Sequence, residues 1–168
     1  GAGFIGSHLV DKLVSKGIQV TIIDDFSTGK RENINPAAYC WEQDISNVDI
    51  KTLTQYMKDI DVVFHLAAKT AVQESIENPL LYNKNTEITL KLLEAAKRAN
   101  VGKFIFSSSS SIYGNAKIPT GEEHKLDPMS PYAQSKINDE NYCRLYTELY
   151  GLDVCILRYF NVYGDRMS

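Results

Sequence analysis

The chain alternates between two hydrophobic patterns, short apolar runs and longer segments in which apolar residues recur with helical spacing. The run Val20-Thr21-Ile22-Ile23 is typical of a buried strand. After a glycine-rich start, helical spacing is seen at Leu9, Val10, Leu13 and Val14. The patterns predict strands at residues 20–23, 39–43, 61–66, 103–108 and 154–158. They predict helices that end at Gly17 and that span residues 49–58, 80–100 and 130–150.

Strands that alternate with helices favour βαβ units and a parallel sheet. We therefore predict an α/β fold, a doubly wound parallel sheet of the Rossmann type, with residues 1–168 in one domain. Ligands of such sheets bind beyond the carboxyl ends of the strands. That edge would carry residues 1–6, Asp24, Asp44, 67–69, 107–111 and 160–161.

The glycine-rich start has the spacing of a phosphate-binding loop. Gly1, Gly3 and Gly6 satisfy G-x-G-x-x-G, a pattern that lets backbone N–H groups approach a pyrophosphate at a helix N-terminus. The motif is weak evidence alone, but a helix, a strand and an acid follow it here. That acid, Asp24, comes 18 residues after Gly6, near the ~20-residue offset of the acid that binds an adenosine ribose.

The charges beside Asp24 bear on which dinucleotide would bind. Asp24 and Asp25 together should repel a 2′-phosphate, so NAD is preferred to NADP. Lys30 and Arg31 could weaken this preference, or they could be ordinary solvated loop charges.

A tyrosine and a lysine at helical spacing suggest acid–base chemistry. Tyr132 and Lys136 are four residues apart, so they leave the same face of a helix. Ser130 can act as the N-cap and Pro131 fits the first helical position. A nearby ammonium and the positive end of the helix would both favour the phenolate. The alternative is a surface tyrosine beside a solvated lysine, because Y-x-x-x-K is a common pattern.

Composition excludes several classes of protein. With 43% hydrophobic and 23% charged residues, the chain resembles an ordinary globular protein, and its net charge of −3 leaves no footprint for nucleic acid. No apolar run approaches the length of a membrane span, and no signal peptide is seen. The cysteines lack metal or redox spacing, which suggests reduced thiols in a cytoplasmic protein. The three histidines show no ligand spacing, so we predict no metal site.

Nothing precedes Gly1, although the glycine fingerprint normally follows a strand, and the chain has no initiator Met. We therefore expect a fragment that begins inside its phosphate-binding loop and lacks the central first strand of its sheet. Such a fragment should have a damaged core and little activity by itself.

The motifs together resemble the extended short-chain dehydrogenase/reductases, specifically the NAD-dependent epimerase/dehydratase family, and most closely its UDP-glucose 4-epimerases. The resemblance runs the length of the chain. Its segments are residues 1–8 (GAGFIGSH), 24–29 (DDFSTG), 43–45 (QDI), 65–68 (HLAA), Asn85, 107–114 (SSSSSIYG), 130–136 (SPYAQSK) and 158–164 (RYFNVYG).

The resemblance implies roles in binding NAD. It assigns the cofactor to Gly3, Phe4, Ile5, Gly6, Asp24, Asp25, Phe26, Ser27, Thr28, Gly29, Asp44, Ile45, Leu66, Ala67, Ala68, Lys69, Asn85, Tyr132, Lys136 and Phe160. Asn85 would bond the backbone near the cofactor. An asparagine on a helix surface is the alternative, since Ile88 stands where the family usually has glycine.

The resemblance also implies a catalytic set of Ser109, Tyr132 and Lys136. Tyr132 would take the proton of the sugar C4 hydroxyl, Ser109 would bond that oxygen, and Lys136 would lower the pKa of Tyr132. Ser109 and Tyr132 would contact the substrate, and Asn161 would reach its phosphates. The reaction would pass through a transient 4-keto sugar.

Several alternatives remain open. Family dehydratases carry acids just after the active-site Ser or Thr, where this chain has Ser110 and Ser111, so dehydration is disfavoured. The resemblance also implies that the parts that recognise the sugar lie mostly after residue 168, in a smaller C-terminal substrate domain that this fragment lacks. Another UDP-sugar, such as UDP-N-acetylglucosamine or UDP-glucuronate, could therefore be the substrate. A sensor that binds NAD without turnover is a third possibility. The family also implies a homodimer of the full-length protein, through helices like residues 80–100 and 130–150.

Overall fold

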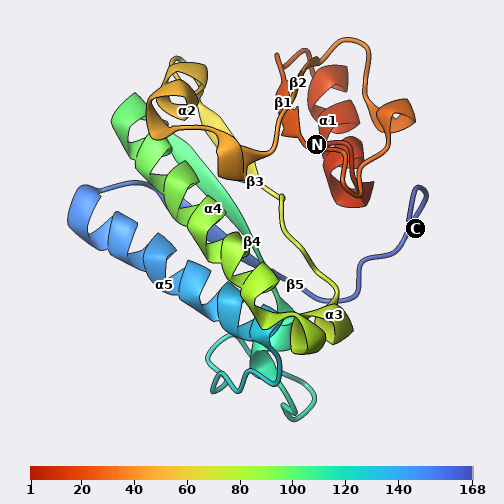
Figure 1. The fold of residues 1–168 in the computed structure, drawn as a ribbon, viewed down its shortest axis with the longest axis vertical. Helices are drawn as coiled ribbons and strands as arrows, with labels where there is room; N and C mark the ends of the chain where they lie inside the picture. Colours follow the sequence, from red (N-terminus) through yellow and green to blue (C-terminus); the bar gives the residue numbers. More distant parts are fainter. Residues whose placement is uncertain (168) are drawn as a thin grey trace. The chain divides into compact units, whose positions relative to one another are not determined.

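The computed structural model describes residues 1–167. Within these residues five strands form, close to the predicted positions, and the pairings between them are parallel (Figure 1). β1 (Thr21–Asp24) pairs with β2 (Tyr39–Glu42), with Thr21 opposite Tyr39. β3 (Val62–His65), β4 (Lys103–Ser109) and β5 (Val154–Tyr159) form a second sheet in the order β3-β4-β5.

The strands therefore form two parallel sheets where a single one was predicted. The two-stranded sheet belongs to a first unit, Gly1–Val48 with the segment from Val162 onward, and the three-stranded sheet to a second unit, Asp49–Asn161. In a doubly wound sheet of order 3-2-1-4-5-6, these pairings match strands 2 with 3 and strands 4, 5 and 6. The parallel α/β class is confirmed.

In the first unit, helix α1 (Phe4–Ser15) begins at Gly3 and precedes β1. Lys16 caps its end, and Gly17 then takes a positive φ of 75° that favours glycine, as the sequence predicted. Val10 of the helix and Ile22 of the strand are buried. Two short 3₁₀ turns, Arg31–Asn33 and Ile45–Asn47, lie in the segments that follow β1 and β2.

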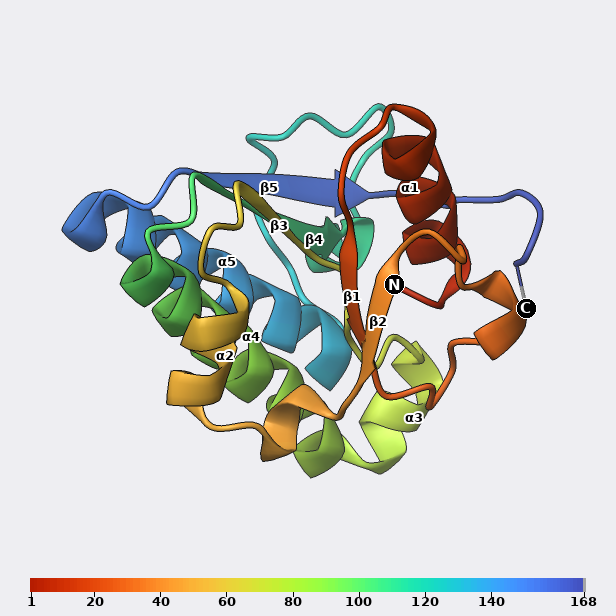
Figure 2. The same cartoon turned by 90° about the horizontal axis from the view of Figure 1, so that it is seen from above.

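In the second unit, α2 (Ile50–Tyr56), α4 (Pro79–Ala99) and α5 (Pro131–Tyr150) lie along one face of the sheet (Figures 1 and 2). β4 alternates accordingly, with Phe104, Phe106 and Ser108 buried between its half-buried neighbours. This period of two puts one face of the strand against the helices. A short helix, α3 (Val72–Glu77), precedes α4 and was not predicted.

Helix α5 begins as its sequence predicts. Ser130 is the N-cap, and its Oγ accepts a hydrogen bond from the N–H of Ala133 at 3.1 Å. Pro131 occupies the first helical position, and Gly151 ends the helix with a φ of 70°. The cap fixes where the helix starts and therefore where Tyr132 stands in its first turn.

Replacing Ser130 with alanine is expected to lower the free energy of unfolding by about 1 kcal/mol, because the first turn loses its side-chain acceptor. Urea unfolding of the full-length protein measures this loss. Ser130→Gly is the matched control and should cost only a few tenths of that. Equal losses in both variants would contradict the role of the cap.

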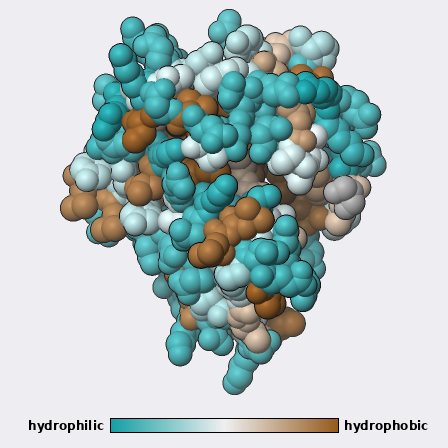
Figure 3. Space-filling model, in the orientation of Figure 1, coloured by the Kyte–Doolittle hydropathy of each residue, from teal (hydrophilic) through white to brown (hydrophobic). Residues whose placement is uncertain are grey.

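The exposed apolar side chains of α5 cluster toward its end. Leu145, Leu149 and Tyr150 are 44%, 65% and 53% exposed. Figure 3 shows a mainly hydrophilic surface with separate hydrophobic patches, one at the left, where Figure 1 shows the end of α5. None of the described helices is long and apolar enough to cross a membrane.

Candidate active site

The glycine loop packs tightly on one side and is open on the other. A Cβ on Gly1 would collide with the side chain of Ile22 in β1, and one on Gly6 would lie 3.0 Å from the Cα of Gly1. A Cβ on Gly3 would meet no atom within 4 Å. The first and last glycines therefore let helix, loop and strand approach one another, and Gly3 leaves free space at the start of α1.

The start of α1 suits an anion. Its N-cap, Gly3, provides no side-chain cap, and the first turn contains no acid. The first hydrogen bond within the helix runs from the N–H of Ser7 to the carbonyl of Gly3 at 2.9 Å. The N–H groups of the preceding turn, including Phe4 and Ile5, point out of the helix end, where a phosphate can accept from them.

Asp24, at the end of β1, organises this loop. One carboxylate oxygen accepts from the backbone nitrogens of Gly1 and Ala2 at 2.7 and 2.8 Å, and the other from the N–H of Phe26 at 3.0 Å. Burial raises the pKa of Asp24, and the hydrogen bonds from the backbone N–H groups of Ala2 and Phe26 act against that rise. The carboxylate is therefore ionised at neutral pH, and the oxygen facing Phe26 retains capacity for a hydroxyl donor.

The loop after Asp24 contacts Arg31, the basic residue that could have bound the 2′-phosphate of NADP. The Arg31 guanidinium lies 4.4 Å from the centre of the Phe26 ring and is paired with Glu42. Asp25 accepts from the N–H and the hydroxyl of Ser27 at 2.9 and 2.7 Å. Arg31 is therefore a solvent-exposed loop charge that is paired with Glu42, and Asp24 and Asp25 are the acids at the end of β1.

The remaining first-unit candidates, Thr28, Gly29, Asp44 and Ile45, lie near the ends of β1 and β2. A Cβ on Gly29 would lie 2.8 Å from both the Ala2 Cβ and an Asp24 oxygen, so this position also requires close approach. Asp44 begins the 3₁₀ turn after β2, where its side chain accepts from the N–H of Ser46 at 2.8 Å. Ile45 is buried.

In the second unit, Tyr132 and Lys136 are buried on one face of α5, with 7% and 4% of their surface exposed. The Lys136 amine donates to the Ser107 carbonyl of β4 at 2.9 Å. It lies 4.8 Å from the centre of the Phe106 ring and 6.0 Å from that of Tyr132. The alternative of a surface tyrosine beside a solvated lysine is therefore wrong.

The expected effect of Lys136 on the pKa of Tyr132 is not seen in this structure. Burial raises the pKa of Tyr132, a hydrogen bond with Ser109 acts against it, and the charge of Asp139 raises it further. Burial also lowers the pKa of Lys136 to about 8. Desolvation therefore outweighs the attraction that helical spacing suggested, because both groups lie in a dry layer between sheet and helix.

Ser109 ends β4 beside Tyr132. Its oxygen accepts from the N–H of Ser111 at 3.2 Å, and its hydroxyl lies near enough to Tyr132 to act against the rise that burial causes in the pKa of the phenol. The structure thus brings together the three residues predicted to be catalytic, Ser109, Tyr132 and Lys136.

Asn85 holds the segment that follows β3. It is buried in α4, accepts from the N–H of Lys69 at 3.0 Å and donates to the carbonyl of Lys69 at 3.0 Å. The helix-surface alternative is wrong, and the predicted backbone contact forms. Leu66, Ala67 and Ala68 lead from β3 into this clamped segment.

Phe160 and Asn161 follow β5 and are exposed. The Phe160 ring stacks on Tyr113 with centroids 6.3 Å apart and an interplanar angle of 29°. This contact fixes where the chain leaves the sheet, near the carboxyl end of β4.

One network near the site was not predicted. Glu140 is fully buried and accepts from the Ser108 hydroxyl at 2.6 Å and from Arg158 at 2.9 and 2.8 Å. Arg144 adds a hydrogen bond at 2.9 Å, and Arg158 also donates to the Tyr113 hydroxyl at 2.7 Å. The network ties α5, β4 and β5 together directly behind Ser109. The sequence signal that could have indicated this network is a glutamate on the same face of the predicted helix as Lys136.

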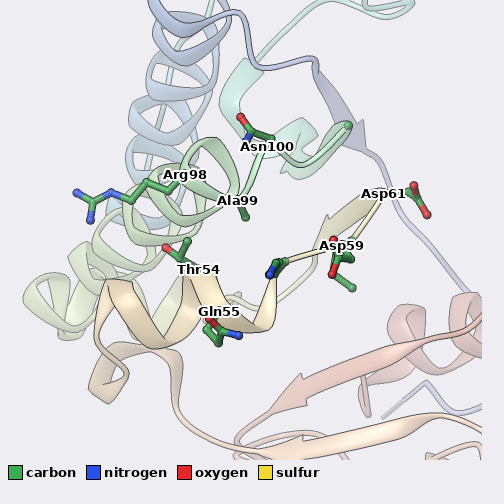
Figure 4. A pocket seen from close by; sticks show the side chains of 10 residues that line it. Thr54, Gln55, Asp59, Asp61, Arg98, Ala99 and Asn100 are labelled. Carbon is green, nitrogen blue, oxygen red and sulfur yellow. The ribbon is translucent and has the colours of Figure 1, made fainter.

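A pocket of about 760 Å³ lies at the opposite edge of the three-stranded sheet (Figure 4). Thr54, Gln55, Asp59, Asp61, Arg98 and Asn100 are among the residues that line it, on the segments before β3 and β4. None of the predicted site residues lines this pocket, so it does not bear on the chemistry above.

A profile of the NAD dependent epimerase/dehydratase family matches residues 1–168. The chain belongs to this family. NAD is the family's cofactor, and the extended short-chain dehydrogenase/reductase resemblance is confirmed.

The proteins that this chain is similar to include 4-epimerases of UDP-sugars. A putative UDP-glucose 4-epimerase of Methanocaldococcus jannaschii is 42% identical over 172 residues, which cover 100% of this chain and 56% of the relative. The UDP-glucose 4-epimerase of Thermotoga maritima, solved with UDP-glucose, matches with a TM-score of 0.94 and 41% identity, covering 100% of this chain and 56% of its own. The UDP-N-acetylglucosamine 4-epimerase of Methanobrevibacter ruminantium, solved with UDP-N-acetylmuramic acid, matches with a TM-score of 0.93 and 45% identity, covering 99% and 55%.

The chain spans about half the length of the curated relatives it matches.

Proposed function

We propose that the full-length protein containing this chain is an NAD-dependent nucleotide-sugar 4-epimerase of the UDP-glucose/UDP-galactose type. The observation that carries the proposal is the assembly of Ser109, Tyr132 and Lys136 at the end of β4 and the start of α5. Its similarity to 4-epimerases over the whole chain supports the same activity.

The residues of the first unit fit NAD. Gly3 leaves open space at an uncapped helix N-terminus, which suits a pyrophosphate, and Asp24 is an ionised acceptor for a ribose hydroxyl. Arg31 is held by Glu42, so its charge is compensated beside Asp24 and Asp25. These features support NAD over NADP.

The residues of the second unit assigned to the cofactor would hold its nicotinamide end. Lys136 would donate to the ribose, and the clamp between Asn85 and Lys69 would fix the segment 66–69 against it. Phe160 would flank the ring. When bound, NAD takes up a hydride from the sugar and returns it, so the reaction has no net redox change.

Tyr132 would carry the proton. As the phenolate, Tyr132 would accept the proton of the C4 hydroxyl as the sugar becomes a 4-keto sugar, and as the phenol it would return that proton when the hydroxyl reforms. Ser109 would hydrogen bond the same sugar oxygen in both states, because a hydroxyl can donate and accept. Burial excludes water, so the proton exchanges between Tyr132 and the sugar. Asn161 would contact the phosphates of the nucleotide sugar.

Dehydration is a poorer fit to the same loop. The residues that follow Ser109 are Ser110 and Ser111, and neither can act as a carboxylate acid or base at neutral pH. An NAD-binding sensor without turnover also fits poorly, because the catalytic serine, tyrosine and lysine are all present and assembled. A different UDP-sugar epimerase remains the second candidate, which the UDP-N-acetylglucosamine 4-epimerase similarity favours.

We propose that the full-length protein is cytoplasmic and forms a homodimer. The three cysteines are free thiols, which suits a reducing compartment. The exposed Leu145 and Leu149 of α5 could contact a second copy through the outer face of α4 and α5.

Incubation of the full-length protein with UDP-glucose is expected to produce UDP-galactose without added NADH, because the cofactor is regenerated in each cycle. Chromatography of the nucleotide sugars measures the product. UDP-N-acetylglucosamine and UDP-glucuronate, supplied in parallel, distinguish the second candidate. Release of water to give a stable 4-keto-6-deoxy sugar would contradict the proposal, and bound NAD without conversion of any UDP-sugar would favour a sensor.

A further inference from the structure

A buried carboxylate on α5 has no part in the chemistry described above. Asp139 stands one turn after Lys136 on the same face of the helix and is fully buried. Both of its carboxylate oxygens are enclosed and lack a hydrogen-bond partner. Buried polar groups are normally hydrogen bonded, and an ionised one without donors is costly. An acid in this position therefore calls for an explanation.

The nearest polar groups satisfy it only in part. Thr86 and Thr89 of α4 lie beside the carboxylate, and their hydroxyls act against the rise that burial causes in its pKa. The same hydroxyls lie 3.5 Å from the Ser135 carbonyl and 2.9 Å from the Asn85 carbonyl, so two backbone acceptors compete with Asp139 for them.

The other titratable groups around Asp139 and Lys136 do not supply a free negative charge. His65 of β3 is buried against Thr89 at 2.9 Å, and its pKa of about 3 keeps it neutral. Burial raises the pKa of the Cys143 thiol to about 12. Glu140 is ionised but already paired with Arg144 and Arg158. Asp139 is thus the anion that can offset the charge of the buried Lys136 amine.

We propose that Asp139 is a positioning residue that keeps the Lys136 amine protonated in its dry layer and thereby sets the pH range in which Tyr132 exchanges protons with a sugar. The part concerning Tyr132 rests on the proposed function. An ammonium donates charge-assisted hydrogen bonds to the Ser107 carbonyl and to a ribose hydroxyl, whereas a neutral amine donates weaker ones and has no charge to favour a phenolate.

The electrostatics agree with this role. Burial lowers the pKa of Lys136 to about 8, and the charge of Asp139 is the largest effect opposing burial. Burial raises the pKa of Asp139 itself to about 6, which the charge of Lys136 moderates. Asp139 is therefore ionised and effective above about pH 6 and protonated below it. Removing its charge should therefore matter above about pH 6, where it lowers the pKa of Lys136 and also removes a charge that raises the pKa of Tyr132.

Asp139→Asn, made in the full-length protein, tests the proposal by two measurements. The first is the pKa of Lys136 by NMR of lysine side chains labelled with ¹³C, with the resonance assigned by Lys136→Arg. The second is the pH profile of kcat/KM for UDP-glucose. Glu148→Gln, which removes an exposed carboxylate from the same helix, is the matched control. Asp139→Ser provides a second neutral variant if the first does not fold.

In the Asn variant, the pKa of Lys136 is expected to fall by roughly one to three pH units. The alkaline limb of the profile should move down with it, so activity at pH 8 falls at least about tenfold, while wild type and variant converge below about pH 6. A merely structural role would lower activity equally at all pH values and overturn the proposal. An unchanged pKa of Lys136 would overturn it as well. Absence of turnover in the wild type would refute the proposed function instead, and the NMR titration would still decide the charge of Lys136.

Discussion

Replacing Tyr132 with phenylalanine is expected to lower the kcat of epimerisation by about 10² to 10⁴, the usual contribution of a positioned general acid–base group. The phenolic oxygen is the group that would exchange the proton with the sugar, and phenylalanine removes only that oxygen. The ring should stay in place, because it packs edge-on against Tyr82 with centroids 6.3 Å apart. The rate of conversion of UDP-glucose by the full-length protein measures the effect.

The matched control is Tyr146→Phe, which removes another buried phenolic hydroxyl from the same helix. Tyr146 donates to Glu94 at 3.0 Å, so its loss should cost about 1 kcal/mol of stability and leave turnover unchanged. Bound NAD should be retained in both variants, since neither removes a cofactor contact of the first unit. Turnover that survives Tyr132→Phe would contradict the role of the phenol. Lost NAD in that variant alone would show that the contact of Tyr132 with the cofactor, rather than proton transfer, accounts for the lost turnover.

The local elements were predictable because their signals are local. The sequence Ser-Pro before Tyr132 contains an N-cap and a residue suited to the first turn, and α5 begins there. Helix α3 was missed because Val72–Glu77 is six residues long, and Asn78 and Pro79 follow it directly. So short a segment shows little periodicity.

Burial was harder to predict than position. Helical spacing placed Tyr132 and Lys136 on one face, but it could not show that the face lies against β4. In that layer desolvation governs both pKa values, and the effect expected from a neighbouring charge is reversed for Tyr132. Asn85 illustrates the same limit, because its contact with Lys69 joins residues 16 apart on different elements.

The Glu140 network lies beyond sequence reasoning for a further reason. Its members come from α5, β4 and β5, and only the packing of these elements brings Ser108 and Arg158 to the same carboxylate. In the sequence, Glu140 could be recognised only as an acid on one face of a predicted helix. That this face is buried is known only from the structure. Its partners could not be named until the register of β4 and β5 was known, with Ser108 opposite Arg158.

Removing this carboxylate by Glu140→Ala is expected to lower the free energy of unfolding by about 3–5 kcal/mol, because Arg158 would be left partly buried without its partner. Urea unfolding of the full-length protein at pH 7 measures the loss. The exposed Glu148→Ala, on the same helix, should stay within about 0.5 kcal/mol of wild type.

The pH dependence of this loss identifies its cause. Burial raises the pKa of Glu140, but the hydrogen bonds from Arg158 and Ser108 outweigh burial and lower it below its usual value. An acid with a lowered folded pKa stabilises the fold above its unfolded pKa and loses that stabilisation as pH falls through the folded value. The difference between wild type and Glu140→Ala should therefore shrink on acidification. Replacing both partners, as in Glu140→Leu with Arg158→Leu, should restore part of the stability, because no uncompensated charge remains. If the double variant were less stable than Glu140→Ala at pH 7, the loss would come from packing rather than from a buried unpaired charge.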